Sequence, residues 1–297
     1  MTLDNTFIFQ HNKAKLQLSI KPEYLNHQFV SGNKLRKLKY NLLEAKKHNK
    51  KKVLTFGGAF SNHIAATAYA AKANNFNSIG VIRGEELATL PLNPTLSFAK
   101  ECGMKFEYIS RATYRIKHQN EFIEKLKHKF GDIYIIPEGG TNALAIQGCE
   151  EILQPDDSVF DVICCSVGTG GTISGLINSA KDHQKIIGFP ALKGDFLSRE
   201  IRKFAKAKNW ELITDYHFGG YAKINDNLVE FINTFKSDYG IPLDPIYTGK
   251  MMFGIIDLMN KNYFPEGTKI LAIHTGGLQG IEGVNLKLKQ QNKRLID

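Results

Sequence analysis

Short apolar runs rich in β-branched residues alternate with helix-like stretches along most of the chain, and this alternation limits the possible folds more than any other feature. Strands separated by helices of about 10–15 residues form βαβ units, whose parallel sheets need helices on both faces. The sequence therefore predicts an α/β protein. We expect strands at 53–56, 78–82, 105–109, 133–136, 159–166, 185–189 and 270–274, and helices at 61–75, 94–102, 119–129, 142–153, 172–181, 196–207, 225–239 and 250–261.

The domain organisation is suggested by an acidic, proline-containing segment at residues 154–157, which we interpret as a crossing between domains. We expect a small α/β domain at residues 45–154 and a larger domain built from residues 1–44 and 155–297. A chain of 297 residues buries about 75% of its unfolded surface, so neither domain needs a disulfide or a metal to fold.

Composition excludes several classes of function. The four cysteines include an adjacent pair, Cys164 and Cys165, in an apolar run, and no C-x-x-C occurs, so we expect small buried hydrophobes and no metal site. The net charge of +10 comes from scattered lysines without interleaved aromatics, which argues against nucleic acid and favours capture of an anionic ligand. No signal peptide and no run of roughly 18 apolar residues is found, so we expect a cytoplasmic protein that does not enter membranes.

The sharpest motif is the loop from Ser166 to Thr172, which follows an apolar strand and opens a helix. Its glycines allow a tight turn with unobstructed N–H groups, and the helix N-terminus adds a dipole that favours an anion. A dinucleotide site would need a third glycine where Ile173 stands, and no P-loop lysine follows. The loop predicts a phosphate cup made by Gly168, Thr169, Gly170, Gly171 and Thr172; the alternative is a tight turn without a ligand.

Two further glycine-containing loops each follow directly after a predicted strand. In the loop 57–63, Ser61 has a side chain suited to cap the N-terminus of the helix that follows. A substrate carboxylate would fit at that N-terminus, although an N-cap without a ligand is the alternative. The spacing is not that of the G-x-S-x-G nucleophile elbow, so serine hydrolase chemistry is disfavoured. The other loop is 273–277. We interpret the similar segment 137–142 mainly as a structural helix entry.

The basic segment 30–40 holds too many lysines for position alone to single out one. Its run Gly-Asn-Lys-Leu-Arg-Lys-Leu at 32–38 resembles the lysine motif of fold-type-II pyridoxal-phosphate enzymes, specifically the D-cysteine desulfhydrases and 1-aminocyclopropane-1-carboxylate deaminases. In that motif the lysine after asparagine holds pyridoxal 5'-phosphate as a Schiff base, which implies Lys34 here. The resemblance also implies a two-domain, three-layer fold with parallel-rich sheets, like that of the tryptophan synthase β subunit, and a homodimer.

Other segments resemble the same family in the same order, so that the resemblance spans residues 32–277. The loop 57–63 implies that Asn62 contacts the phenolic oxygen of the cofactor, and that Ser61, Asn62 and His63 serve the substrate. The loop 166–172 is similar to the phosphate loop. The segments 220–221 and 244–250 resemble the two active-site tyrosine segments, which implies Tyr221 and Tyr247 as catalytic residues beside Lys34 and Ser61.

The implied function is a lyase or deaminase acting on a small amino acid. The cyclopropane deaminases carry a glutamate against the pyridine nitrogen where this chain has Thr248, and Thr275 is a second candidate neighbour of that nitrogen. A neutral hydroxyl suffices to eliminate a good leaving group, so β-elimination of D-cysteine to pyruvate, ammonia and sulfide is favoured. The alternatives are a 1-aminocyclopropane-1-carboxylate deaminase that forms 2-oxobutanoate, a lyase for another small D-amino acid, and a non-catalytic protein that binds pyridoxal phosphate.

Overall fold

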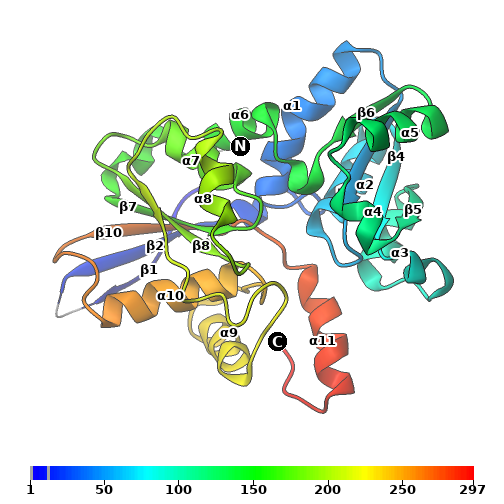
Figure 1. Ribbon diagram of the computed structural model, residues 1–297. Coiled ribbons are helices and arrows are strands. Elements are labelled where there is room, and N and C mark those ends of the chain that lie inside the picture. Colours follow the sequence, from blue (N-terminus) through cyan, green and yellow to red (C-terminus); the bar gives the residue numbers. More distant parts are fainter. Residues whose placement is uncertain (1–2, 12–13) are drawn as a thin grey trace.

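The computed structural model describes residues 3–11 and 14–297, which form two lobes, each built around one sheet (Figure 1). The larger sheet has the strand order β1-β2-β10-β7-β8-β9 and is parallel except for β1, which runs antiparallel to β2. The smaller sheet is parallel throughout, in the order β5-β4-β3-β6. The strands are β1 (Thr6–His11), β2 (Leu16–Lys21), β3 (Lys52–Gly57), β4 (Asn77–Arg83), β5 (Lys105–Ile109), β6 (Ile133–Ile136), β7 (Val162–Val167), β8 (Lys185–Pro190), β9 (Trp210–Leu212) and β10 (Lys269–Ile273).

Each helix expected from the alternating pattern is present, with ends that differ by a few residues. The fold prediction is therefore confirmed. The helices are α1 (Asn33–Lys47), α2 (Asn62–Ala73), α3 (Pro94–Glu101), α4 (Arg111–Arg115), α5 (Asn120–Phe130), α6 (Ala143–Glu150), α7 (Gly171–Ser179), α8 (Phe196–Arg202), α9 (Asp226–Tyr239), α10 (Thr248–Asn260) and α11 (Gly280–Gln290), with short 3-10 turns at η1 (Glu23–Leu25), η2 (Glu85–Thr89), η3 (Glu138–Gly140) and η4 (Pro155–Val159).

The larger sheet is covered on both faces. Strand β7 shows this, because all residues of the strand are buried. Successive side chains of a strand point to opposite faces. Cys164 accordingly packs in the core shared with α9 and α10, whereas Cys165 packs in the core shared with α6, α7 and α8. The cysteines are free and buried, as the sequence predicted.

Two features of the N-terminal region differ from the expectation or extend it. The hairpin β1–β2 was not predicted, although the alternating apolar residues Leu16, Leu18 and Ile20 are fully buried and complete the larger core. Helix α1 packs its apolar face on the smaller sheet, since Leu38 and Leu42 lie in one cluster with residues of β3 and α2. The domain boundaries at residues 45 and 154 stay a prediction.

Among the described residues, no helix is both long and apolar enough to cross a membrane.

Helices α1, α6 and α7 pack closely, and this contact sets the position of the two segments that carry the sharpest motifs. A Cβ atom on Gly148 of α6 would lie 2.0 Å from the carbonyl oxygen of Arg36 in α1. A Cβ atom on Gly175 of α7 would lie 2.5 Å from the Cβ atom of Cys149. Backbone cannot move aside as a flexible side chain can, so both positions require glycine for this packing.

We predict that Gly148→Ala destabilises the protein by about 1–3 kcal/mol, because the added methyl group forces α1 and α6 apart. Urea unfolding measures the change. Gln147→Ala is the matched control, since Gln147 is an exposed residue of the same helix. An unchanged unfolding midpoint for Gly148→Ala would contradict the close packing.

Candidate active site

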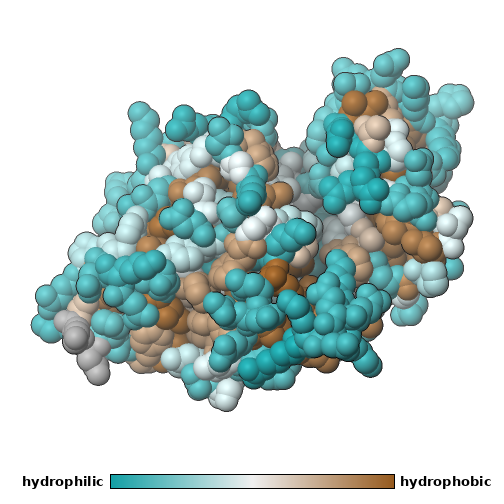
Figure 2. Space-filling model, turned by 60° about the horizontal axis from the view of Figure 1, so that its bottom comes forward, coloured by the Kyte–Doolittle hydropathy of each residue, from teal (hydrophilic) through white to brown (hydrophobic). Residues whose placement is uncertain are grey.

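A cavity of about 970 Å³ lies at the carboxyl ends of the parallel strands, where loops of both lobes meet. Figure 2 shows the molecule hollowed between the larger and the smaller lobe. Open α/β sheets bind ligands at this edge of the strands. The cavity is lined by Lys34 at the start of α1 and by parts of the loops after β3, β7 and β10. The glycine loops singled out from the sequence are therefore brought to one site.

Lys34 is held at the base of this cavity by its neighbour Asn33. The Lys34 Nζ donates to Asn33 Oδ1 at 2.8 Å, and Asn33 Nδ2 donates to Thr172 Oγ1 at 2.7 Å. Gly32 precedes them with φ +69, and a Cβ atom there would lie 1.9 Å from the carbonyl oxygen of Thr275. Burial, and then the charge of Lys37, lowers the pKa of Lys34 to about 7. A lysine in this state is a nucleophile and a base near neutral pH.

The turn Gly168–Thr172 forms a cradle with a buried cation beside it. Gly170 has φ +85, and a Cβ atom on Gly171 would lie 3.0 Å from the Nζ atom of Lys37. That ammonium group donates to the carbonyl oxygen of Gly139 at 2.9 Å, and burial lowers its pKa. Among the residues that the structure describes, no carboxylate forms an ion pair with Lys37. The turn and Lys37 therefore offer N–H groups and an uncompensated positive charge to an anion.

The sequence did not single out Lys37, because lysines are frequent in this segment. The sequence feature that could have identified Lys37 is its spacing of three residues from Lys34, which places both side chains on one face of α1. The segment 137–142 was also interpreted mainly as a helix entry, yet Glu138, Gly139 and Thr141 line the cavity. The Thr141 and Thr169 hydroxyl oxygens lie 2.6 Å apart, so this segment packs on the glycine turn.

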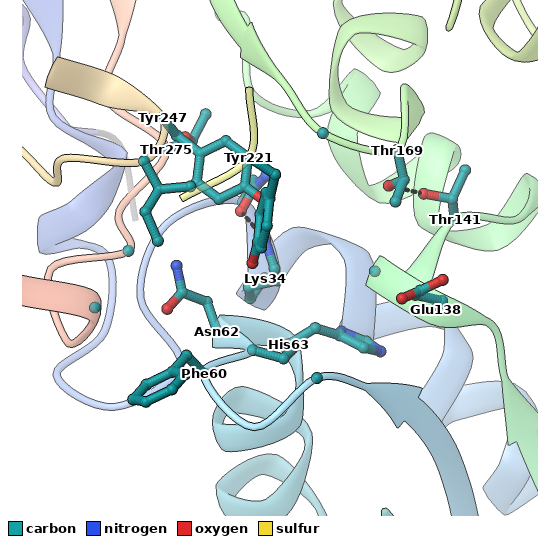
Figure 3. A pocket seen from close by; sticks show the side chains of 18 of the residues that line it. Lys34, Phe60, Asn62, His63, Glu138, Thr141, Thr169, Tyr221, Tyr247 and Thr275 are labelled. Carbon is teal, nitrogen blue, oxygen red and sulfur yellow. Dashed lines mark hydrogen bonds between the residues drawn. The ribbon is translucent and has the colours of Figure 1, made fainter. Parts of the chain in front are cut away.

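The three residues expected at the start of α2 all line the cavity, but their side chains point in different directions. Ser61 caps α2 by accepting from the Ile64 N–H group at 3.4 Å. The Asn62 Oδ1 atom is buried and has no hydrogen-bond partner among the described residues. Figure 3 shows Asn62 below Thr275 and Tyr221, whereas the His63 ring points the other way, toward Glu138. His63 Nε2 lies 2.7 Å from Thr55 Oγ1, and burial holds the pKa of the ring well below its ordinary value, so it is neutral.

Tyr221 and Tyr247 stand together on the opposite side of the cavity, with ring centroids 6.3 Å apart. Figure 3 shows both tyrosines above Lys34, and all three residues line the cavity. A Cβ atom on Gly168 would lie 3.2 Å from the Tyr247 hydroxyl, so the phenol packs closely on this glycine. Burial raises the pKa of both phenols, which keeps them protonated near neutral pH and able to donate hydrogen bonds.

The two threonines proposed to face a pyridine nitrogen have different surroundings. Thr275 lines the cavity, with its hydroxyl 3.2 Å from the hydroxyl of Ser166. Thr248 is fully buried and is not part of the cavity wall; its hydroxyl donates to Asp244 Oδ2 at 2.6 Å. Asp244 also accepts from the N–H groups of residues 246, 247 and 248. Thr248 therefore serves the turn that starts α10, and of the two we favour Thr275 as the residue that meets a ligand.

The outer wall of the cavity is closed by the C-terminal helix α11. A Cβ atom on Gly283 would lie 2.7 Å from the ring of Phe60, and the Lys287 ammonium group stands 4.8 Å from the centre of that ring. Phe60 fills the space between the α2 loop and α11.

The residues present fit pyridoxal phosphate. Its aldehyde requires a reactive amine, which Lys34 offers. Its phosphate requires an unobstructed cradle with positive charge, which the Gly168–Thr172 turn and Lys37 offer. The unpartnered amide oxygen of Asn62 marks a polar position that no described residue satisfies.

Comparison with known proteins agrees with this fit. The model of a family described as pyridoxal-phosphate dependent enzymes matches residues 5–276. The chain is 33% identical to the mitochondrial bifunctional D-cysteine desulfhydrase/1-aminocyclopropane-1-carboxylate deaminase of Arabidopsis thaliana, over 89% of this chain and 73% of that protein. It is 30% identical to the 1-aminocyclopropane-1-carboxylate deaminase of Rhizobium rhizogenes, over 92% of this chain and 90% of that protein. The crystal structure of an ACC deaminase homologue superposes with a TM-score of 0.84 at 29% identity, covering 98% of this chain and 94% of that one.

We predict that the apo-protein captures pyridoxal phosphate at a rate that rises with pH and has its midpoint near pH 7. The Lys34 amine is nucleophilic only when deprotonated, and burial has lowered its pKa to about 7 from the 10.5 of an ordinary lysine. Near-visible absorbance after rapid mixing measures the rate, and Lys34→Met, which has no amine at this position, is the control. A rise centred near pH 10 instead would contradict the lowered pKa.

Proposed function

Because the chain belongs to the pyridoxal-phosphate dependent enzymes, we propose that it degrades a small amino acid, and that D-cysteine is the preferred substrate. The observation that carries the proposal is the Lys34 amine, whose pKa is lowered to about 7 at the base of a cavity that also contains an anion cradle. The relatives named for D-cysteine desulfhydrase and for 1-aminocyclopropane-1-carboxylate deaminase support both this substrate and the alternative.

We assign the cofactor to residues that converge on the cavity. Lys34 would hold the aldehyde carbon, the Gly168–Thr172 turn with Lys37 would hold the phosphate, and Asn62 would meet the phenolic oxygen. Thr275 would face the pyridine nitrogen. When bound, pyridoxal phosphate supplies an electron sink that is conjugated with the amino nitrogen of the substrate.

The chain's own groups divide the remaining work. The Lys34 amine removes the α-proton, since its pKa of about 7 leaves a large neutral fraction near pH 7. The N-terminal end of α2 with Ser61 receives the substrate carboxylate through free N–H groups. Tyr221 and Tyr247 remain protonated, so they can donate hydrogen bonds or a proton at the leaving group. Loss of the α-proton and of the β-sulfur, followed by hydrolysis, converts D-cysteine and water into pyruvate, ammonia and hydrogen sulfide.

The choice between desulfhydrase and deaminase rests on the hydroxyl groups of Thr275 and Ser166. A carboxylate against the pyridine nitrogen would keep that nitrogen protonated and strengthen the electron sink, which helps to open a carbon–carbon bond. Asp244 is nearby, but its carboxylate is committed to four hydrogen bonds with its own turn. Neutral hydroxyls suffice to expel sulfide, so we favour D-cysteine over the cyclopropane substrate. A homodimer and a cytoplasmic location remain predictions from the sequence.

We expect the purified holoenzyme to release sulfide and pyruvate from D-cysteine faster than it releases 2-oxobutanoate from 1-aminocyclopropane-1-carboxylate. Colorimetric sulfide and keto-acid assays measure both reactions, and Lys34→Ala should abolish both together with the yellow cofactor band. The substrate preference is wrong if the cyclopropane acid gives 2-oxobutanoate while D-cysteine gives no sulfide. The whole assignment is wrong if the parent protein, saturated with cofactor, shows no such band.

The two threonines can be separated by isosteric substitution. We predict that Thr275→Val lowers turnover roughly two- to tenfold and shifts the cofactor absorbance, because a hydrogen bond worth about 0.5–1.5 kcal/mol is lost at the ligand. Thr248→Val should instead lower the free energy of unfolding by about 1–3 kcal/mol, because buried Asp244 loses a partner. Steady-state kinetics, absorbance and urea unfolding distinguish the two. A shift of the absorbance by Thr248→Val alone would reverse the assignment.

A further inference from the structure

Lys250 is a buried lysine that the proposed reaction does not use. It lies in the first turn of α10, only 2% of it is exposed, and it is among the largest fully buried side chains of the protein. Among the residues that the structure describes, no carboxylate lies within ion-pair distance of it. Its ammonium group instead donates to two backbone carbonyl oxygens, those of His217 and Gly220, each at 2.9 Å.

A buried charge is costly unless hydrogen bonds satisfy it, so these carbonyls are strongly held partners. Burial lowers the pKa of Lys250 to about 8, while the charge of Asp244 acts in the opposite direction. The group is therefore largely protonated at neutral pH, when it attracts both carbonyls as a cation.

The loop that receives these hydrogen bonds, residues 213–225, has an unusual backbone. Phe218, Gly219, Gly220 and Ala222 all have positive φ, a region that residues with a side chain rarely adopt. Such a conformation persists only where the surroundings enforce it. The loop is also fixed to α10 by Phe218, whose ring packs edge-on against Phe253 with centroids 5.0 Å apart.

Tyr221 lies inside this run of positive φ and depends on the shape of the loop for its direction. The residue is 41% exposed, so its contact with Tyr247 covers only part of it and does not by itself fix its direction. Lys250 binds the carbonyl of the residue directly before Tyr221 and the carbonyl three residues earlier, which defines the turn that precedes the phenol.

We propose that Lys250 is a positioning residue: by fixing the carbonyl groups of His217 and Gly220, it directs the Tyr221 hydroxyl into the cavity. The inference rests on the proposed function only in giving Tyr221 a part in the reaction. The two hydrogen bonds from Lys250 to the loop, which we call the clamp, are a separate physical claim.

Hydrogen exchange of the holoenzyme tests the clamp without any turnover. Lys250→Met removes the charge and the donors at similar length, and it should raise exchange at 213–225 while leaving both sheets protected. Lys250→Arg, which keeps the charge and donors, should restore part of the protection. Lys289→Met, at an exposed position of α11, is the matched control. If Lys250→Met does not fold, Lys250→Gln, which retains a neutral donor, takes its place with a smaller increase expected. Unchanged exchange at 213–225, or an increase spread over both sheets, overturns the clamp.

A double-mutant cycle with Tyr221→Phe tests the link to the reaction, using the amino acid that the parent turns over fastest. We expect Lys250→Met and Tyr221→Phe each to lower kcat/KM about tenfold, and the double variant to be no slower than Tyr221→Phe alone. Effects that multiply would show that Lys250 acts independently of Tyr221 and would overturn the positioning role. If the parent turns over no amino acid, the proposed function fails, whereas the exchange experiment still decides on the clamp.

Discussion

The side-chain amide of Asn33 joins the reactive amine to the anion cradle, and the rest of the site depends on this bridge. Its oxygen accepts from Lys34 and its nitrogen donates to Thr172, a residue 139 positions further along the chain. Both ends of the amide are thereby satisfied inside the protein, where an unsatisfied group would be costly. A small displacement of α1 against α7 would break one of the two hydrogen bonds. Helix α6 limits that displacement, because it packs closely on α1 at Gly148 and on α7 at Gly175.

Buried cations fall into two groups that differ in their partners. Lys21 pairs with Asp157, and Arg36 pairs with Glu23, and these ion pairs connect elements of the scaffold. Lys34, Lys37 and Lys250 are bound by amide, carbonyl or hydroxyl oxygens instead, and their pKa values are lowered. Oxygen dipoles satisfy hydrogen-bond donors without neutralising the charge. Lys37 therefore brings positive charge to the cradle, where an anionic cofactor would be bound.

The order of strands and helices could be predicted from the sequence because period and turn residues are local properties. The family motif supplied Lys34, and the glycine loops supplied the cradle. Residues whose part depends on a distant segment could not be found in this way. The direction of the His63 ring follows from Thr55 on the neighbouring strand, and the difference between Thr248 and Thr275 follows from the fully buried Asp244. Lys37 and Lys250 resemble solvent-exposed lysines until the packing around them is known.

The contact of Phe60 with Gly283 and Lys287 has a consequence for biosynthesis. A ribosome releases the segment with Lys34 and the α2 loop long before it releases α11, and domains generally fold in the order of their synthesis. The smaller lobe can thus begin to fold while one wall of the cavity is still untranslated. The cofactor can consequently be enclosed only after α11 has been synthesised and has packed against Phe60.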